Sequence, residues 1–106
     1  MTENPLLERA KRFVSALRHC QVLGIAVHEA VSSGLTLRLP YSTQIIGNPE
    51  SGVIHGGAIT TLMDTTCGIS TVCVLSGFEI CPTLDLRIDY MRPAEPNKDV
   101  FGFAEC

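Results

Sequence analysis

Residues 57–75 read GAITTLMDTTCGISTVCVL, and Asp64 is the only charged residue among them. The other residues are aliphatic, sulfur-containing, hydroxyl-bearing or glycine. Nineteen residues would span roughly 28 Å as a helix, which is close to the thickness of a bilayer core. The central acid, the many hydroxyls and the lack of flanking lysine or arginine disfavour a membrane span. We therefore expect a helix buried inside a globular fold and hydrophobic on nearly all sides.

The residues before this stretch predict a helix and a β-hairpin. Asn4 and Pro5 are typical of a helix start, and apolar residues then recur at helical spacing. Two apolar segments with a Ser-Ser-Gly turn between them indicate paired strands. The expected elements are a helix over about 5–18, strands over 21–29 and 35–39, a turn at 32–34 and a loop over 41–52.

The residues after the long helix contain the clearest strand pattern. Apolar residues at 84, 86, 88 and 90 alternate with charged residues at 85, 87 and 89, which is typical of a half-buried strand. A second strand is expected to begin at Val100 and to be cut off at Cys106, so we expect a C-terminally truncated fold. The element order predicts an α+β protein in which an antiparallel sheet curves around the long helix.

Composition narrows the possible function. The chain has 106 residues, enough for one domain, and 45% are hydrophobic whereas 18% are charged. Self-association is the simplest way to cover so much apolar surface. The net charge is −3 and no basic patch is apparent, so we expect no nucleic-acid partner.

The cysteines and histidines indicate a reduced protein without metal. There are five cysteines and no C-x-x-C pair, and Cys67 and Cys73 lie in an apolar run. We expect reduced, buried thiols in a cytoplasmic protein rather than disulfides. The three histidines show no zinc-ligand spacing, so we expect neither metal nor cofactor. The polar N-terminus does not resemble a secretory signal.

The residues able to do chemistry gather where the loop enters the long helix. Gly56 and Gly57 allow close approach to the backbone, and the first amides of a helix can stabilise an anion or a developing oxyanion. Asp64 lies on the same helix face, about 10.5 Å further along the axis. One carbonyl cannot contact both groups at that distance. A joint reaction would therefore need Gly57 of one copy and Asp64 of another, which predicts a homodimer.

From about residue 24 onward the sequence resembles the PaaI-like branch of the hotdog thioesterase superfamily. The resemblance rests on residues 48–57 (NPESGVIHGG), on Asp64 nine residues after His55, and on residues 83–94 (TLDLRIDYMRPA). It implies a hotdog fold, dimers that pair into tetramers, and hydrolysis of acyl-CoA thioesters without a metal. The implied domains are an N-terminal helix over residues 1–20 and a hotdog domain over residues 21–106.

The resemblance also implies roles for individual residues. Asp64 would be the general base or nucleophile, and the Gly57 amide would polarise the thioester carbonyl. Asn48 would orient water or substrate from the opposite subunit. Thr83 matches a position where relatives hold water with a hydroxyl, and His55 would support the loop or the thioester end. The implied substrate contacts are Gly56, Met63 and, at the CoA phosphates, Arg92.

Most of these residues also have an ordinary structural interpretation. Asp64 could cap a neighbouring loop, the two glycines could serve only as a helix entry, and His55 could bond the loop. Asn48 could be a turn residue, and it lies seven residues before His55 where several relatives have six. Simple strand alternation would turn Thr83 away from the face that carries Leu84.

Two other function classes stay open beside hydrolysis. A hotdog dimer could bind or sense acyl-CoA without turnover, although a pure binder needs no acid beside an acyl tail. Hotdog hydratases typically pair Asp and His five residues apart, whereas His55 precedes Asp64 by nine. We therefore expect an acyl-CoA thioesterase that holds a medium-length or aromatic acyl group in an apolar slot between subunits.

Overall fold

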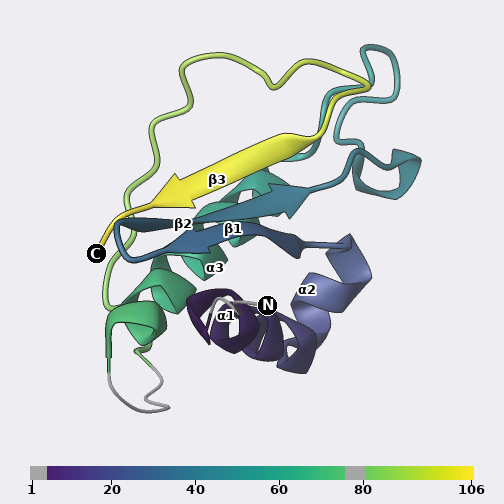
Figure 1. Cartoon of the computed structure of the whole chain (residues 1–106). Coiled ribbons are helices and arrows are strands. Elements are labelled where there is room, and N and C mark those ends of the chain that lie inside the picture. Colours follow the sequence, from purple (N-terminus) through teal and green to yellow (C-terminus); the bar gives the residue numbers. More distant parts are fainter. Residues whose placement is uncertain (1–4, 76–80) are drawn as a thin grey trace.

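The computed structural model describes residues 5–75 and 81–106. Figure 1 shows a small sheet backed by helices, with the N-terminal helices and the long helix on one side. The strands form an antiparallel sheet in the order β1-β2-β3. In chain order the elements are α1 (Pro5–Ala16), α2 (Arg18–Leu23), β1 (Ala26–Val31), β2 (Gly34–Leu39), a 3-10 turn η1 (Thr43–Ile45), α3 (Gly56–Val74) and β3 (Val100–Ala104).

The core lies between the sheet and the helices. Strand β2 alternates as predicted, and Leu35, Leu37 and Leu39 are all buried. Helix α3 packs against β2 and β3, while α1 packs against β1 and α3. The α+β class and the helix-backed antiparallel sheet are therefore confirmed, because alternating strands and an amphipathic helix can bury their apolar faces only against one another.

Helix α3 is confirmed almost to the residue, but it is buried on one side only. Leu62, Thr66 and Ile69 are buried, whereas Cys67 is exposed. Gly102 of β3 lies so close that an added Cβ would be 2.9 Å from Thr66 Oγ1. The prediction of a helix buried inside the fold therefore holds for the face of α3 that the sheet covers and not for the opposite face.

The N-terminal prediction needs one correction. The first helix ends at Ala16, and Leu17 has an extended backbone. A second helix follows and includes residues 21–23, which were predicted to begin the strand over 21–29. The strand itself begins at Ala26. Gly24 ends α2 with a φ of 76°, and its N–H donates to the Cys20 and Gln21 carbonyls. A short apolar run does not distinguish helix from strand, and the boundary proposed after residue 20 falls inside α2.

The predicted strand over residues 84–90 is wrong. Residues 81–99 contain no strand, and Figure 1 shows them arching past the open side of β3 rather than lying beside it. Leu84 and Met91 are almost completely exposed. A strand needs a neighbouring backbone to pair with, and this segment has none within the described chain. Strand β3, in contrast, follows the prediction and pairs with β2.

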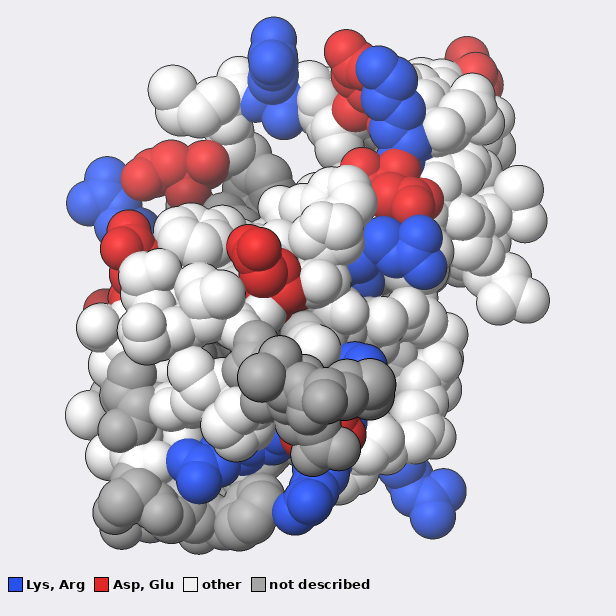
Figure 2. Space-filling view, in the orientation of Figure 1, with Lys and Arg blue, Asp and Glu red and all other residues white. Residues whose placement is uncertain are grey.

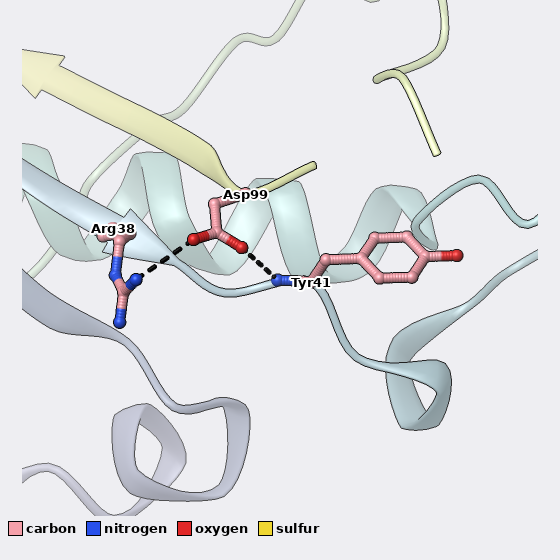
Figure 3. A network of polar contacts seen from close by, with 3 residues as sticks. All are labelled: Arg38, Tyr41 and Asp99. Atoms are coloured by element: carbon pink, nitrogen blue, oxygen red, sulfur yellow. Dashed lines mark hydrogen bonds and ion pairs between the residues drawn. The ribbon is translucent and has the colours of Figure 1, made fainter. Parts of the chain in front are cut away.

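A polar network holds the loop that leads to α3. Asp99, directly before β3, accepts hydrogen bonds from Arg38 Nη1 at 3.1 Å and from the Tyr41 backbone N–H at 2.8 Å. Figure 3 shows the Tyr41 ring pointing away from this carboxylate. The Tyr41 hydroxyl donates to the Gly52 carbonyl at 2.6 Å. The network thus fastens the loop to the ends of β2 and β3 and so positions His55.

The surface combines scattered charges with exposed apolar side chains. On the face shown in Figure 2, the Lys and Arg side chains of the described residues lie scattered rather than in one patch. None of the described helices is long and apolar enough to cross a membrane. Large apolar side chains are exposed on β3 and on the segment before it, including Phe101, Phe103, Leu84, Tyr90 and Met91.

Candidate active site

His55 caps the start of α3. Its backbone N–H donates to the Ile45 carbonyl at 2.8 Å, and its Nδ1 accepts the Gly57 N–H at 2.8 Å. An added Cβ at Gly57 would lie 3.0 Å from that ring nitrogen, so glycine leaves room for the imidazole. A capping side chain satisfies an amide that has no partner inside the helix. The amide predicted to polarise a carbonyl is therefore bonded to His55.

Asn48 is a turn residue. Its side-chain oxygen accepts the Glu50 N–H at 2.9 Å, and its carbonyl accepts the Gly52 N–H at 2.8 Å. Short polar side chains often stabilise turns in this way. Within one chain, the structure therefore gives the Asn48 side chain a local partner.

Asp64 and Thr83 are brought together from segments 19 residues apart. The Thr83 hydroxyl donates to Asp64 Oδ1 at 2.5 Å, which is a short hydrogen bond of the kind that a carboxylate can accept. Strand alternation would turn Thr83 away from the face that carries Leu84, and Leu84 is fully exposed while Thr83 contacts Asp64. Residues 81–83 are not a strand, so alternation does not govern where the Thr83 side chain points.

These two residues border a cavity of about 360 Å³. Its walls come from α1, α2, α3 and the chain after Cys81, and most of them are apolar. The size is within the range of small-molecule sites, roughly 300–1,000 Å³. The lining residues are Phe13, Leu17, His19, Cys20, Asp64, Thr65, Gly68, Ile69, Val72, Cys81, Pro82 and Thr83.

Sequence reasoning missed the contribution of the N-terminal helices to this cavity. His19 lies near the helix face of Asp64, because its Nε2 is 3.4 Å from Thr61 Oγ1. Phe13 and Leu17 were expected only as the apolar face of a helix. Gly68 carried a usable signal, since it stands one helical turn after Asp64 in the interior of α3, whose other two glycines, Gly56 and Gly57, lie in its first turn.

The cysteines are all free thiols in different environments. Burial raises the pKa of the Cys20 thiol, and a hydrogen bond with Thr65 offsets part of this rise. Burial likewise raises the pKa of Cys73, against a smaller opposite effect from Arg9. Cys67, Cys81 and Cys106 are exposed, so the expectation of buried thiols is confirmed for Cys20 and wrong for Cys67.

The remaining predicted residues do not line the cavity beside Asp64. Gly56 and Arg92 line a second cavity of about 650 Å³, where the Tyr90 hydroxyl donates to the Gly56 carbonyl at 2.8 Å. Met63 lines a third cavity of about 270 Å³ between α3 and β3. Among the described residues, no group of three or more His, Cys, Asp or Glu could hold a metal ion. The structure therefore joins Asp64 with Thr83 and Gly57 with His55, but it keeps the two pairs separate.

Comparison with known proteins identifies the family of the chain. A family model described as the thioesterase superfamily matches residues 51–106, which include the start of α3, Asp64 and Thr83. A Halobacterium salinarum protein named "Putative esterase" is 35% identical over 68% of this chain and 50% of its own length. A medium/long-chain acyl-CoA thioesterase of Salmonella typhimurium is 27% identical over 81% of this chain and 64% of its own length.

The fold has a counterpart among solved structures. A crystal structure of a Pseudomonas aeruginosa protein is 83% identical, with a TM-score of 0.87, and covers 96% of this chain and 76% of that one. The chain spans between half and just under two thirds of the curated relatives that it matches. With its α+β hotdog fold, the chain belongs to the thioesterase superfamily.

Proposed function

We propose that the chain hydrolyses acyl-CoA thioesters to a free acid and CoA. The observation that carries the proposal is the Asp64 carboxylate, bonded to the Thr83 hydroxyl at the edge of a largely apolar cavity. An apolar cavity beside a single carboxylate suits an acyl group whose reactive carbonyl lies at the carboxylate end. The Salmonella relative is named for a thioesterase reaction of this class, which favours acyl-CoA as substrate.

The reaction follows from what each group can accept and donate. Thr83 holds Asp64 Oδ1, which leaves Oδ2 to accept a proton from water. The water oxygen bonds to the thioester carbonyl carbon, and the carbon–sulfur bond then breaks. The proton held by Asp64 passes to the departing CoA sulfur, so that the products are an acid and a thiol. The same carboxylate therefore acts first as base and then as acid.

The oxyanion would be stabilised by Gly57 of a second copy. Along one helix Gly57 and Asp64 are about 10.5 Å apart, too far to reach one carbonyl. The His55 ring bonds the Gly57 amide, so an incoming carbonyl would have to displace the ring. The exposed apolar side chains of β3, Phe101 and Phe103, favour burial against another subunit. We therefore propose a homodimer that can pair into a tetramer, in a cytoplasmic setting.

The binding alternative rests on a specific observation. Gly57 and Asn48, two of the residues expected to act on substrate, both have local partners in His55 and Glu50. If these contacts persisted with ligand bound, the chain would bind acyl-CoA in its apolar cavity without hydrolysing it. Asp64 favours hydrolysis, because a carboxylate adds nothing to the binding of an acyl tail.

Replacing Asp64 with Asn tests the proposal. The wild-type chain should release free thiol from a panel of acyl-CoAs, and Asp64→Asn should lower kcat/KM at least about a hundredfold, roughly 2.7 kcal/mol of barrier. Asn keeps the size of the side chain and the acceptor for Thr83 but cannot take a proton from water. The assay measures thiol release, with the oligomeric state of each protein followed by light scattering.

Asp89→Asn is the matched control, because Asp89 is an exposed acid on the segment that carries Thr83. It should change kcat/KM less than about twofold. Equal activity in Asp64→Asn and wild type would exclude Asp64 as the base. Saturable acyl-CoA binding without turnover in the wild type would instead establish the binding alternative.

A further inference from the structure

We infer that Gly68 determines the length of the acyl group that the chain accepts. Gly68 lines the cavity beside Asp64, within α3 and one helical turn further along. Residues four apart lie on one helix face, so both positions look into the same space. The inference rests on the proposed function, because it assigns the cavity to the acyl part of an acyl-CoA.

Neither packing nor backbone conformation requires glycine at this position. Elsewhere the structure shows the reason for a glycine: Gly24 and Gly52 have φ values of 76° and 77°, and Gly102 lies against Thr66 and Leu62. At Gly68 the φ is not positive, and an added Cβ would meet nothing within 4 Å. Glycine inside a helix is destabilising relative to alanine. Glycine at position 68 therefore lowers stability without a local structural reason, which favours a functional role for the open space beside it.

The shape of the cavity assigns the open space beside Gly68 to the acyl tail. Its apolar walls include Phe13 from α1, Leu17 from the link between α1 and α2, and Ile69 from α3. Any side chain at position 68 would project between these walls and shorten the space that leads away from Asp64. The carboxylate marks the end where the thioester would lie, so the apolar end past Gly68 is left for the tail of the acyl group.

The extent of the lining sets the expected length. From Asp64 to Val72 the helix advances eight residues, about 12 Å along its axis. An extended hydrocarbon advances somewhat less than its bond length of about 1.5 Å at each bond, so roughly eight to ten carbons fit in this distance. We therefore expect linear acyl groups of medium length to bind best.

The test measures binding separately from turnover. Non-hydrolysable S-alkyl-CoA thioethers with two, four, eight and ten carbons are titrated into the wild type and into Gly68→Val by calorimetry. Wild-type affinity should rise by up to about fourfold per methylene as far as the octyl compound. Gly68→Val should bind the octyl compound at least about tenfold more weakly and the ethyl compound within about twofold of wild type.

Two further variants keep the result interpretable. Cys67→Val places the same valine side chain at the neighbouring residue, which is exposed and lines the third cavity, between α3 and β3, so it should leave the chain-length profile unchanged. Gly68→Ala adds one methyl group, so it should raise Tm and weaken only the longest ligands. It serves as the test variant if Gly68→Val does not fold.

Each outcome bears on a different claim. The role of Gly68 would be overturned if the position-68 variants bound every thioether as tightly as wild type, or if they bound all chain lengths equally more weakly. Either result would leave hydrolysis by Asp64 intact. A chain-length profile that shifts as expected in a protein without thioesterase turnover would support Gly68 and overturn the proposed function. Absence of thioether binding to the wild type would overturn the inference.

Discussion

Two segments of this chain have nearly the same pattern and different structures. Residues 35–39 read LTLRL and residues 84–88 read LDLRI. The first lies in the middle strand of the sheet, where Leu37 has 0% exposure, whereas Leu84 in the second is fully exposed and belongs to no strand. Alternation determines which side chains share a face, but a strand forms only where another backbone supplies hydrogen bonds.

The neighbours of the two segments explain the difference. Strand β2 pairs with β1 on one side and with β3 on the other, so both of its edges are bonded. The segment over residues 81–99 passes outside β3 and pairs with none of the three strands. Its main tie to the core near its start is the Thr83 hydroxyl on Asp64. The segment that carries a candidate catalytic residue is therefore held by side chains rather than by a sheet.

Replacing one leucine in each segment by alanine should give the largest difference in the free energy of unfolding. Leu37→Ala should lower the free energy of unfolding by about 3 kcal/mol, because it leaves a cavity between the sheet and α3. Leu84→Ala should change it by less than about 0.5 kcal/mol, because an exposed leucine has few contacts to lose. Urea denaturation followed by circular dichroism gives both values. A loss at Leu84 that grows as the protein is diluted would instead place this segment in a subunit interface.

The cysteines give a difference in reactivity. Cys20 lies in the packed helical layer, where burial raises the pKa of its thiol, whereas Cys81 is exposed at the start of the unpaired segment. Because the thiolate is the reactive form, a raised pKa lowers the reactive fraction at a given pH. Cys81 should react with iodoacetamide at pH 8 at least about tenfold faster than Cys20. Mass spectrometry of timed digests measures both rates.

Denaturation is the control for the cysteine experiment. In concentrated urea both thiols are solvated, so the two rates should become similar. Equal rates in buffer would mean that the layer formed by α1 and α2 opens readily, and the contrast between a packed layer and a loosely held segment would be wrong.

The smallest effect is expected at the two arginine–aspartate pairs. Arg38 and Asp99 join β2 to the start of β3, and Asp99 also holds the Tyr41 backbone (Figure 3). Asp99→Asn should cost about 0.5–1 kcal/mol in the free energy of unfolding, and less at high salt, since the pair is partly exposed. Asp89→Asn should have no measurable effect, because its pair with Arg87 is largely exposed. Urea denaturation at low and high salt compares them, and equal losses would contradict the comparison.

Much of the fold could be read from pattern alone. The long apolar helix, the hairpin and β3 were all predicted, because helix and strand periodicities are local properties of the chain. The break at Leu17 was not predicted, since residues 18–23 form a short helix that could equally have started a strand. The failure at residues 84–90 has a different cause, because their alternation is genuine and the missing element is a partner strand.

In the candidate site, the residues could be predicted from the sequence, whereas their contacts could not. Asp64 was predicted because a lone acid in an apolar helix is visible in any reading of the chain, and Thr83 because a motif contained it. Their hydrogen bond, and the cavity that they border, depend on how residues 81–83 and the N-terminal helices meet α3. The bond between His55 and Gly57 was likewise unforeseen, although the two residues are neighbours in the sequence.

The sequence by itself therefore determined the elements whose signals are local: the helix around Asp64, the alternating strands and the glycine pair at the helix start. Only the tertiary structure decided which strands pair and which amide donates a hydrogen bond to His55. It also decided that Gly68 lines the same cavity as Asp64. The physical reason is that periodicity depends on residues a few positions apart, whereas pairing, capping geometry and cavities depend on which distant residues meet.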